Sequence, residues 1–183
     1  AADKLRLRLG AQDAARTDDL RYYDALMDER TDQYCDEVMR VCRERYDSGQ
    51  DVRVVIEEPY DMLLCDDIHC RGRADCIIFT PTTLDVIDLK SGRGALVSAY
   101  RNPQMMVYAL AGLDLCADAD PEIRLTIIQP ALNNISTDSI TRAELLVWRD
   151  EHLIPTARQT VEGTGSYHVG DHCRFCPARP SCR

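Results

Sequence analysis

The stretch GRADCIIFTPTTLDVIDLK, residues 72–90, contains two short apolar runs separated by a break. The runs, Ala74 to Phe79 and Leu84 to Leu89, are rich in β-branched residues, and Pro81-Thr82 lies between them. Runs of this length with such a break are typical of neighbouring β-strands. We therefore expect two adjacent strands of a sheet in this region.

Charged side chains follow these apolar runs in a pattern that suggests a site. Side chains alternate along a strand, so Asp88 and Lys90 should share one face while Leu89 lies on the other. Asp75 begins the neighbouring strand, and pairing of the two strands as a hairpin would bring Asp75, Asp88 and Lys90 together. Mg²⁺ and Mn²⁺ prefer such oxygen ligands, and a bound metal could activate water beside a phosphodiester. Lys90 could then position the water or neutralise developing charge.

The alternative interpretation is a solvated surface pair, which is the usual fate of an isolated Asp-x-Lys. Ile87 and Leu89 flank Asp88 with apolar residues and indicate an interior strand. A charged pair in the interior is costly unless it has a role. The context therefore favours a functional site.

A helix is predicted shortly after this strand. Asn102 has the character of an N-cap, and Pro103 suits the first helical position. Gln104 and Tyr108 are four residues apart and therefore share a face, where they could bind phosphate or orient Lys90. An ordinary amphipathic helix with one buried Tyr is the alternative for this segment taken alone.

The remaining pattern predicts an α/β fold, in which a mixed central sheet is flanked by helices. The N-terminal run 1–9 reads as helical, and a long amphipathic helix should follow, with a break near Arg16-Thr17-Asp18 and an end at Ser48-Gly49. A cap at Asp138 or Ser139 should begin the last helix. The long helix should run from about Ala11 to Tyr46. The other expected elements are strands at Val52–Ile56, Met62–Leu64 and Ile123–Gln129, and helices at Gln104–Cys116 and Thr141–Thr160.

The length and the charge of the chain indicate a protein with one folded core and two locally basic stretches. The 183 residues suit one core with a small appendage, and 22 basic against 31 acidic side chains give a net charge of −9. Residues 71–101 nevertheless carry five basic and three acidic side chains, and residues 171–183 carry three and one, so each is locally +2. No apolar run approaches the roughly 20 residues that span a bilayer. No secretory signal is visible, so we expect a cytoplasmic protein with no membrane partner.

Three of the nine cysteines form a cluster at the end of the chain. Cys173, Cys176 and Cys182 lie in a segment with two prolines and several arginines, which has little to form a core. Thiols so close together in such a segment suggest a metal that supplies folding energy. The other six read as small buried hydrophobes: Cys35, Cys42, Cys65, Cys70, Cys76 and Cys116.

In combination, these motifs resemble the PD-(D/E)xK nuclease superfamily, and in particular its RecB-like branch, which includes the Cas4 nucleases. The resemblance is carried by Gly72 to Asp75, Asp88 to Lys90 and Gln104 to Tyr108, in this order. More closely, the chain is similar to a phage and prophage family of uncharacterised exonucleases, in the stretches Tyr23–Glu29, Asn102–Leu110 and His172–Cys176.

The resemblance implies a restriction-endonuclease-like core in residues 1–165 and a cluster-binding tail in residues 166–183. It further implies Mg²⁺- or Mn²⁺-dependent exonuclease hydrolysis of DNA ends or single strands in phage recombination or replication. Asp75 and Asp88 would be metal ligands and Lys90 catalytic, with Gln104 and Tyr108 beside them. The tail cysteines would hold a [4Fe–4S] cluster, as in Cas4-like nucleases, whereas Zn²⁺ with His172 or His168 is the alternative.

Two departures from that family leave alternatives open. The RecB-like branch takes a further metal ligand from its first helix, for which Asp3 is only a rough counterpart here and Glu57 and Glu58 are other candidates. No cysteine precedes Cys35 to act as a fourth cluster ligand, and the chain begins without Met, so we expect an N-terminal piece before Ala1. Cys35 or Cys42 could take that place only if the long helix passes near the tail. A non-catalytic DNA-binding or assembly module with the same fold, or an RNA hydrolase, therefore remains an alternative. The oligomeric state cannot be read from these residues.

Overall fold

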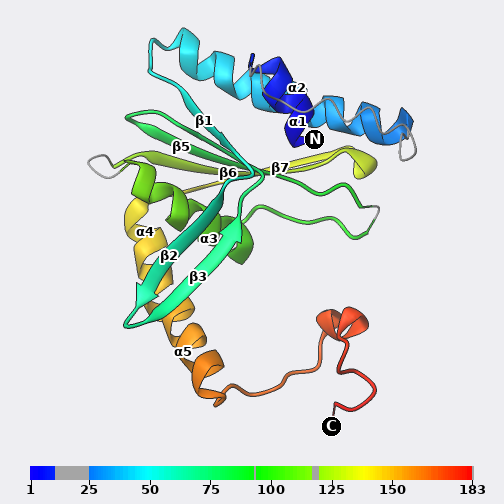
Figure 1. Cartoon of the computed structure of the whole chain (residues 1–183), viewed down its shortest axis with the longest axis vertical. Coiled ribbons are helices and arrows are strands. Elements are labelled where there is room, and N and C mark those ends of the chain that lie inside the picture. Colours follow the sequence, from blue (N-terminus) through cyan, green and yellow to red (C-terminus); the bar gives the residue numbers. More distant parts are fainter. Residues whose placement is uncertain (11–24, 93, 117–119, 183) are drawn as a thin grey trace.

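A computed structural model of the chain describes residues 1–10, 25–92, 94–116 and 120–182, and its centre is a five-stranded mixed sheet (Figure 1). The strand order is β1-β4-β5-β6-β7, and only the β5–β6 pair is parallel. The predicted mixed α/β fold with helices flanking the sheet is thus confirmed. The strands of this sheet are β1 (Arg53–Ile56), β4 (Cys76–Phe79), β5 (Thr83–Leu89), β6 (Glu122–Gln129) and β7 (Asn134–Ile140).

The hairpin expected from the opening stretch is present. β4 and β5 pair antiparallel with Cys76 opposite Ile87, and a Thr-rich turn joins them, in which Thr80 Oγ1 accepts the backbone N–H groups of Thr82 and Thr83. β5 lies between β4 and β6, and its residues from Thr83 to Asp88 are all buried, including the two aspartates Asp85 and Asp88.

Helices cover both faces of the sheet. On one face α3 (Pro103–Leu113), which connects β5 to β6, packs with α4 (Arg142–Trp148) over apolar side chains such as Leu84, Val86 and Leu125. On the other face α1 (Ala2–Arg8) and α2 (Ala25–Asp47) cover a second apolar cluster (Figure 1). Both clusters are buried, so the sheet is the middle layer of three.

A separate two-stranded sheet lies beside α3. It is formed by the antiparallel strands β2 (Pro59–Cys65) and β3 (Ile68–Arg73), which are not hydrogen-bonded to the five-stranded sheet. Figure 1 shows this β2–β3 hairpin in front of α3. One of its faces therefore packs on the helix, and Met62 is buried there.

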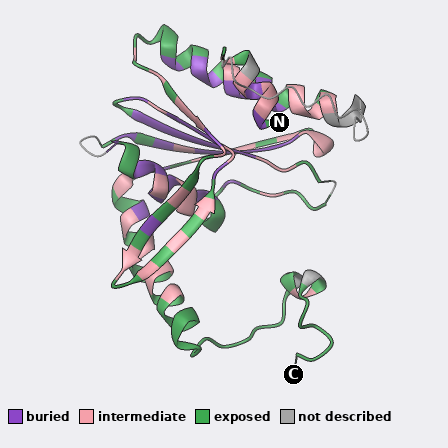
Figure 2. Cartoon of the chain, viewed as in Figure 1, coloured by how far each residue is buried: buried purple, intermediate pink, exposed green. Residues whose placement is uncertain are grey.

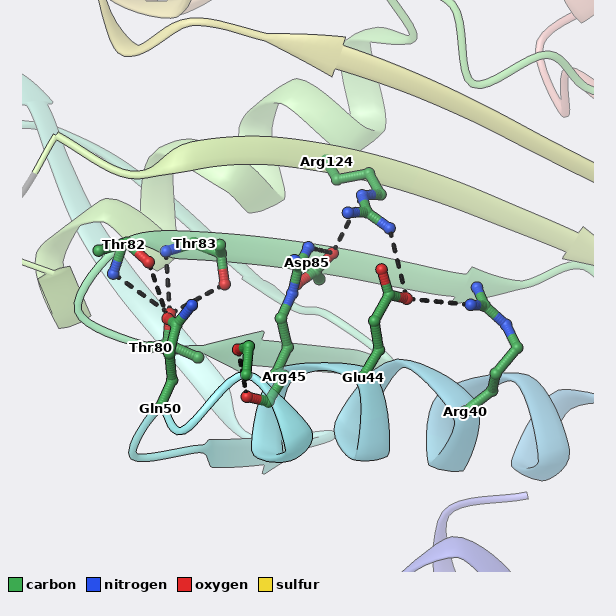
Figure 3. A network of polar contacts seen from close by, with 10 residues as sticks. Arg40, Glu44, Arg45, Gln50, Thr80, Thr82, Thr83, Asp85 and Arg124 are labelled. Atoms are coloured by element: carbon green, nitrogen blue, oxygen red, sulfur yellow. Dashed lines mark hydrogen bonds and ion pairs between the residues drawn. The ribbon is translucent and has the colours of Figure 1, made fainter.

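A buried ion-pair network fastens α2 to the sheet (Figure 3). Arg45 donates two hydrogen bonds of 2.9 Å to the carboxylate of Asp85, and Arg124 of β6 reaches the same carboxylate at 3.4 Å. Asp85 is 2% exposed, so it could not remain charged at this position without such partners. At the solvent side the network continues through Glu44 to Arg40.

Several expectations about element boundaries need correction. Asp75 does not begin a strand, because it lies in the two-residue connection between β3 and β4. Asp138 and Ser139 do not cap the last helix, because they belong to β7, and Thr141 caps α4 in a reciprocal capping box with Glu144. The strands β3 and β7 were not predicted from the sequence. The proposed break near residue 17 and the helix start at Ala11 lie outside the described residues.

The last helical region is continuous but irregular. A five-residue π-turn, Arg149–Leu153, connects α4 to α5 (Ile154–Glu162), whose second residue is Pro155. Proline lacks the N–H that would continue the regular ladder, and a π-turn is a known way of accommodating such an interruption. Gly163 then ends the helix with a positive φ of 68°.

Beyond Gly163 the chain leaves the core. The side chains from Gly163 to Cys182 whose exposure is described all lie open to solvent except Cys173, which is half-buried (Figure 2). A short 3₁₀ turn, Asp171–Phe175, is the only helical element among its described residues. Among the helices that the structure describes, none combines the length and the apolar character needed to cross a bilayer.

Candidate functional site

Asp88 stands at the centre of the candidate site, near the carboxyl end of the central strand β5. Its side chain points to the face covered by α3, because it has the same parity as Leu84 and Val86. The residue is only 2% exposed. Its Oδ2 lies 2.8 Å from Lys90 Nζ, but the angle of approach is not that of a hydrogen bond, and this buried oxygen has no hydrogen-bond donor. The Lys90 ammonium therefore pairs with this oxygen without a hydrogen bond, and a charged pair with one member almost fully buried is a typical mark of a functional site.

Lys90 is held between the strand and α3. Its backbone N–H donates to Ile128 of β6, which fixes the chain just past the end of β5. Its Nζ donates to Gln104 Oε1 at 2.8 Å, in addition to the ion pair with Asp88. The Lys90 side chain is 30% exposed, so the ammonium is at the mouth of the site and within reach of solvent.

Gln104 and Tyr108 belong to the same cluster, as predicted from their spacing. Gln104 Nε2 donates to Tyr108 Oη at 2.7 Å and makes a longer contact of 3.4 Å with Asp88 Oδ1. The helix is positioned by its N-cap, because the Asn102 side chain accepts the N–H groups of Gln104 and Met105 and Pro103 follows it. Asp88, Lys90, Gln104 and Tyr108 thus form one connected polar cluster.

Asp75 is the second carboxylate of the site. Its Oδ2 accepts the backbone N–H of Leu89 at 2.8 Å, which places it beside the segment from Asp88 to Lys90. Burial raises the pKa of Asp75, and the negative charge of Asp88 raises it further, whereas the Leu89 amide and Lys90 act in the opposite direction. A buried carboxylate whose pKa is raised by burial and by a second carboxylate lies where a bound cation would be stabilised.

The donor set fits a hard divalent cation in part. Mg²⁺ is commonly held by one or two carboxylates, with water and phosphate oxygens completing its shell. Two such donors are Asp88 Oδ2, which accepts no hydrogen bond, and the carboxylate of Asp75. The Lys90 ammonium already pairs with Asp88 Oδ2. A metal bound there would have to share this oxygen with Lys90 or displace the ammonium. Within the described part of the chain, no group of three or more His, Cys, Asp or Glu side chains is arranged to hold a metal.

The three acidic residues named as candidates for a further metal ligand differ in how they are placed relative to Asp75 and Asp88. Glu57 donates its backbone N–H to Asp75 O at 3.1 Å, has a positive φ of 48° and adds to the negative charge that raises the pKa of Asp75. Glu58 is exposed. Asp3 pairs with Arg6 at 3.3 Å, and Arg6 in turn donates to Ile56 O, directly before Glu57. Glu57 is therefore the acidic side chain best placed to join the two aspartates.

Tyr60 is a part of this site that sequence reasoning missed. Its ring makes an edge contact with that of Tyr108, with 6.2 Å between centroids and 75° between planes. The ring also lies over Gly72 of β3, where an added Cβ would be 2.5 Å from Tyr60 Oη. The absence of a side chain at Gly72 thus gives Tyr60 the room to pack against Tyr108. A long-range contact of this kind leaves no signal in the local sequence.

The tail cysteines are not gathered in the described residues. Cys176 and Cys182 are exposed and Cys173 is half-buried, and the backbone between them forms successive turns, such as Cys176 N–H to Cys173 O. Cys35 and Cys42 cannot serve as the fourth ligand, because α2 buries both against the sheet, and burial raises the pKa of the Cys42 thiol to about 11. Of the six scattered cysteines, four are buried and two, Cys65 and Cys70, are half-buried.

Comparison with known proteins gives a family but no activity. A solved structure described as "Crystal structure of SSO0001" is similar to this chain with a TM-score of 0.47 and 18% identity, over 80% of this chain. The chain spans 65% of the length of that protein. The family described as "Protein of unknown function (DUF2800)" matches residues 2–183. The match covers almost every residue, and the chain therefore belongs to the DUF2800 family.

Proposed function

We propose that this protein is a divalent-metal-dependent DNA exonuclease with a restriction-endonuclease-like core, acting in phage recombination or replication. The observation that carries the proposal is the buried Asp88 Oδ2, which has no hydrogen-bond donor and lies beside a second carboxylate and a lysine. Lys90 pairs with this oxygen without a hydrogen bond, so it is a donor that a divalent metal could share with the lysine.

The side chains have distinct roles in this proposal. Asp75 and Asp88 would hold Mg²⁺ or Mn²⁺, which when bound lowers the pKa of water and stabilises negative charge on phosphate. The Lys90 ammonium donates to phosphate oxygens or to the attacking water from the mouth of the site. Gln104 holds Lys90 through Oε1, and Tyr108 fixes the Gln104 amide by accepting from Nε2.

The test is degradation of end-labelled DNA, in single-stranded and duplex form, with Mg²⁺, with Mn²⁺ and with a chelator. We expect degradation only with metal, and a loss on the order of 100-fold or more for Asp88→Ala and for Lys90→Ala. Asp51→Ala is the matched control, because Asp51 is an exposed aspartate whose partner Arg53 is also largely exposed. A folded wild-type protein that degrades no DNA with either metal would overturn the proposal.

A second candidate is a non-catalytic DNA-binding or assembly module with the same fold. It is favoured by one observation, which is that the described residues offer two close carboxylates but no group of three metal-binding side chains. Metal-independent binding of DNA, unchanged by Asp88→Ala and without degradation, would support this candidate. Degradation of RNA in preference to DNA would instead indicate another phosphodiester as substrate.

The cysteine tail is proposed to bind a [4Fe–4S] cluster through Cys173, Cys176 and Cys182. The thiols fit in their chemistry, because they are accessible and lie in a segment with almost no buried side chain. A brown protein whose visible absorption is lost in Cys176→Ala would support the cluster. A colourless protein that releases one zinc ion per chain would instead assign the cysteines to Zn²⁺, with His168 or His172 as a further ligand.

A further inference from the structure

The loop between β5 and α3 has no regular secondary structure, yet side chains of the sheet hold its backbone in place. It begins after Lys90 and ends at Asn102, and the contact between Lys90 Nζ and Gln104 Oε1 closes its two ends at 2.8 Å. In Figure 1 the loop runs out past the end of β5 and returns to α3. Both of its ends therefore lie at the candidate site.

Four side chains from the last two strands anchor this loop. Gln129, which is 2% exposed, accepts the N–H of Val97 at 2.8 Å and donates to Ala95 O at 3.2 Å. From β7, Ser136 Oγ accepts the N–H of Ala99 and Asp138 Oδ2 that of Arg101. The fourth side chain, Asn134, donates to Gln129 Oε1 at 3.0 Å. One buried and three half-buried polar side chains that hold a loop in this way indicate that its conformation matters.

The anchored segment presents apolar side chains to solvent. Burial alternates along it. Ala99 is buried and Val97 and Arg101 are half-buried, whereas Leu96, Ser98 and Tyr100 are exposed. Leu96 is 69% exposed and Tyr100 is 72% exposed. The loop thus holds a leucine and a tyrosine in water while its two ends lie at the carboxylate site, and these two exposed side chains have no evident role in the stability of the fold.

We propose that Leu96 and Tyr100 form an apolar platform on which bases of a single-stranded nucleic acid rest as it enters the site. The proposal rests on the proposed function and names the form of its substrate. Aromatic side chains stack on bases of any sequence, because every base has a π-face. Among the described residues of this stretch, the basic side chains of Lys90 and Arg101 are already ion-paired with Asp88 and Glu144, so the platform itself contributes through stacking.

The overall acidity of the chain limits what phosphate contacts can contribute to binding. Binding of nucleic acid through phosphate contacts alone requires many lysines and arginines, whereas here 31 acidic side chains oppose 22 basic ones. Stacking does not depend on this balance, so it can supply the affinity that phosphate contacts cannot. It also requires unpaired bases, which predicts a preference for single strands over blunt duplex.

The experiment measures binding of a fluorescent oligo(dT) of about 16 nucleotides by anisotropy, with wild-type protein in a chelator so that no cleavage occurs. We expect Tyr100→Ala to weaken binding by about 5- to 150-fold, the range found for loss of one stacked base. Tyr100→Phe should bind close to wild type, because the ring is retained. A blunt duplex of the same length should bind weakly and respond little to Tyr100→Ala.

The matched control is Tyr46→Ala, because Tyr46 is 73% exposed and lies on α2, on the other face of the sheet. Equal oligo(dT) affinity for Tyr100→Ala and Tyr46→Ala, both with wild-type melting temperatures, would overturn the platform. If such a protein still degrades DNA with metal, only the platform fails. If wild type neither binds oligo(dT) nor degrades DNA, the proposed function fails with it. Binding through Tyr100 without degradation would keep the platform and favour the non-catalytic module.

Discussion

Tyr60 and Gly72 connect the β2–β3 hairpin to the candidate site through single contacts. Tyr60 packs on Tyr108, which accepts from Gln104, which in turn accepts from Lys90. Each step is a contact between two side chains, so a disturbance at Gly72 should be transmitted toward Lys90. The motif residues of the site thus depend on a neighbour that lies outside the motifs.

Gly72→Ala should destabilise the protein by about 1–3 kcal/mol, because the added Cβ would overlap the Tyr60 ring. Denaturant unfolding measures this cost. In the double-mutant cycle with Tyr60→Ala, the cost of Gly72→Ala should fall markedly, since the overlapping ring is gone. Strict additivity of the two substitutions would show that the ring is not the obstacle.

At the residue scale, the sequence predicted which site residues share a face where these residues are close together in the chain. Asp88 with Lys90, and Gln104 with Tyr108, were placed on common faces by strand and helix periodicity alone, and the structure brings all four together. Asp75 was expected near them and is, although it precedes its strand. Tyr60 and Gln129 were missed, because the contacts of Tyr60 with Tyr108 and of Gln129 with Val97 join residues more than 30 positions apart.

At the scale of elements, the attachment of α2 to the sheet depends on a buried charge pair. Asp85 is satisfied by Arg45 and Arg124, and removal of the carboxylate would leave Arg45 as a buried, unpaired cation. The amphipathic pattern of α2 predicted that one of its faces packs on the core, but the pattern does not specify this pairing.

Asp85→Ala should therefore cost about 3–5 kcal/mol of unfolding free energy. Simultaneous replacement of Arg45 and Asp85 by leucine should cost much less, because no buried charge is left unpaired. Arg40→Ala, at the exposed end of the same network, is the control and should change stability by less than about 1 kcal/mol. Chemical denaturation of the four proteins would check this order, and a mild effect of Asp85→Ala would contradict it.

A second element-scale prediction concerns the start of α4. The Thr141 backbone N–H, its hydroxyl and Arg101 all donate to Glu144, and together they lower the pKa of that carboxyl to about 2. A lowered pKa means that the folded state binds the proton less tightly than the unfolded state. The resulting stabilisation is complete above the ordinary value of 4.5 and is lost as the pH falls through about 2.

Glu144→Gln should accordingly lower the melting temperature at pH 7, and the difference from wild type should shrink as the pH is lowered below 4.5. Thermal melts between pH 7 and pH 3 measure the difference. A gap that widens on acidification would mean that the capping box contributes no charge-dependent stability.

Boundaries of elements were predicted best where periodicity is strong. The central strands β5 and β6 and the helix α3 were located within one to three residues, because long apolar runs and an Asn-Pro cap define them. β7 was missed because it is an edge strand with only two apolar residues, Ile135 and Ile140. β3 was missed because arginine, histidine and glycine fill a strand whose outer face is in water.

At the scale of the whole molecule, the core and the tail should behave as separate parts. Every exposure described from Gly163 to Cys182 is high except that of Cys173, so the tail buries almost nothing against the core. The division at residue 165, drawn from composition and resemblance, remains a prediction that this exposure supports.

Deletion of residues 164–183 should leave the unfolding free energy of the core within about 0.5 kcal/mol of wild type, because surface segments without buried contacts contribute little. Chemical denaturation followed by circular dichroism would check this. A large loss of stability would mean that the tail packs on the core, and the cysteine cluster would then need to be considered part of it.

The central claim is that Asp75 and Asp88 together hold a divalent metal. A crystal structure with Mn²⁺, read by anomalous scattering, tests it most directly. The account predicts one manganese ion bound by oxygens of Asp75 and Asp88 at about 2.0–2.2 Å, with Lys90 turned away from Asp88 Oδ2 or sharing it. Crystals saturated with Mn²⁺ that show no ion there, and an intact pair of Asp88 and Lys90, would contradict it.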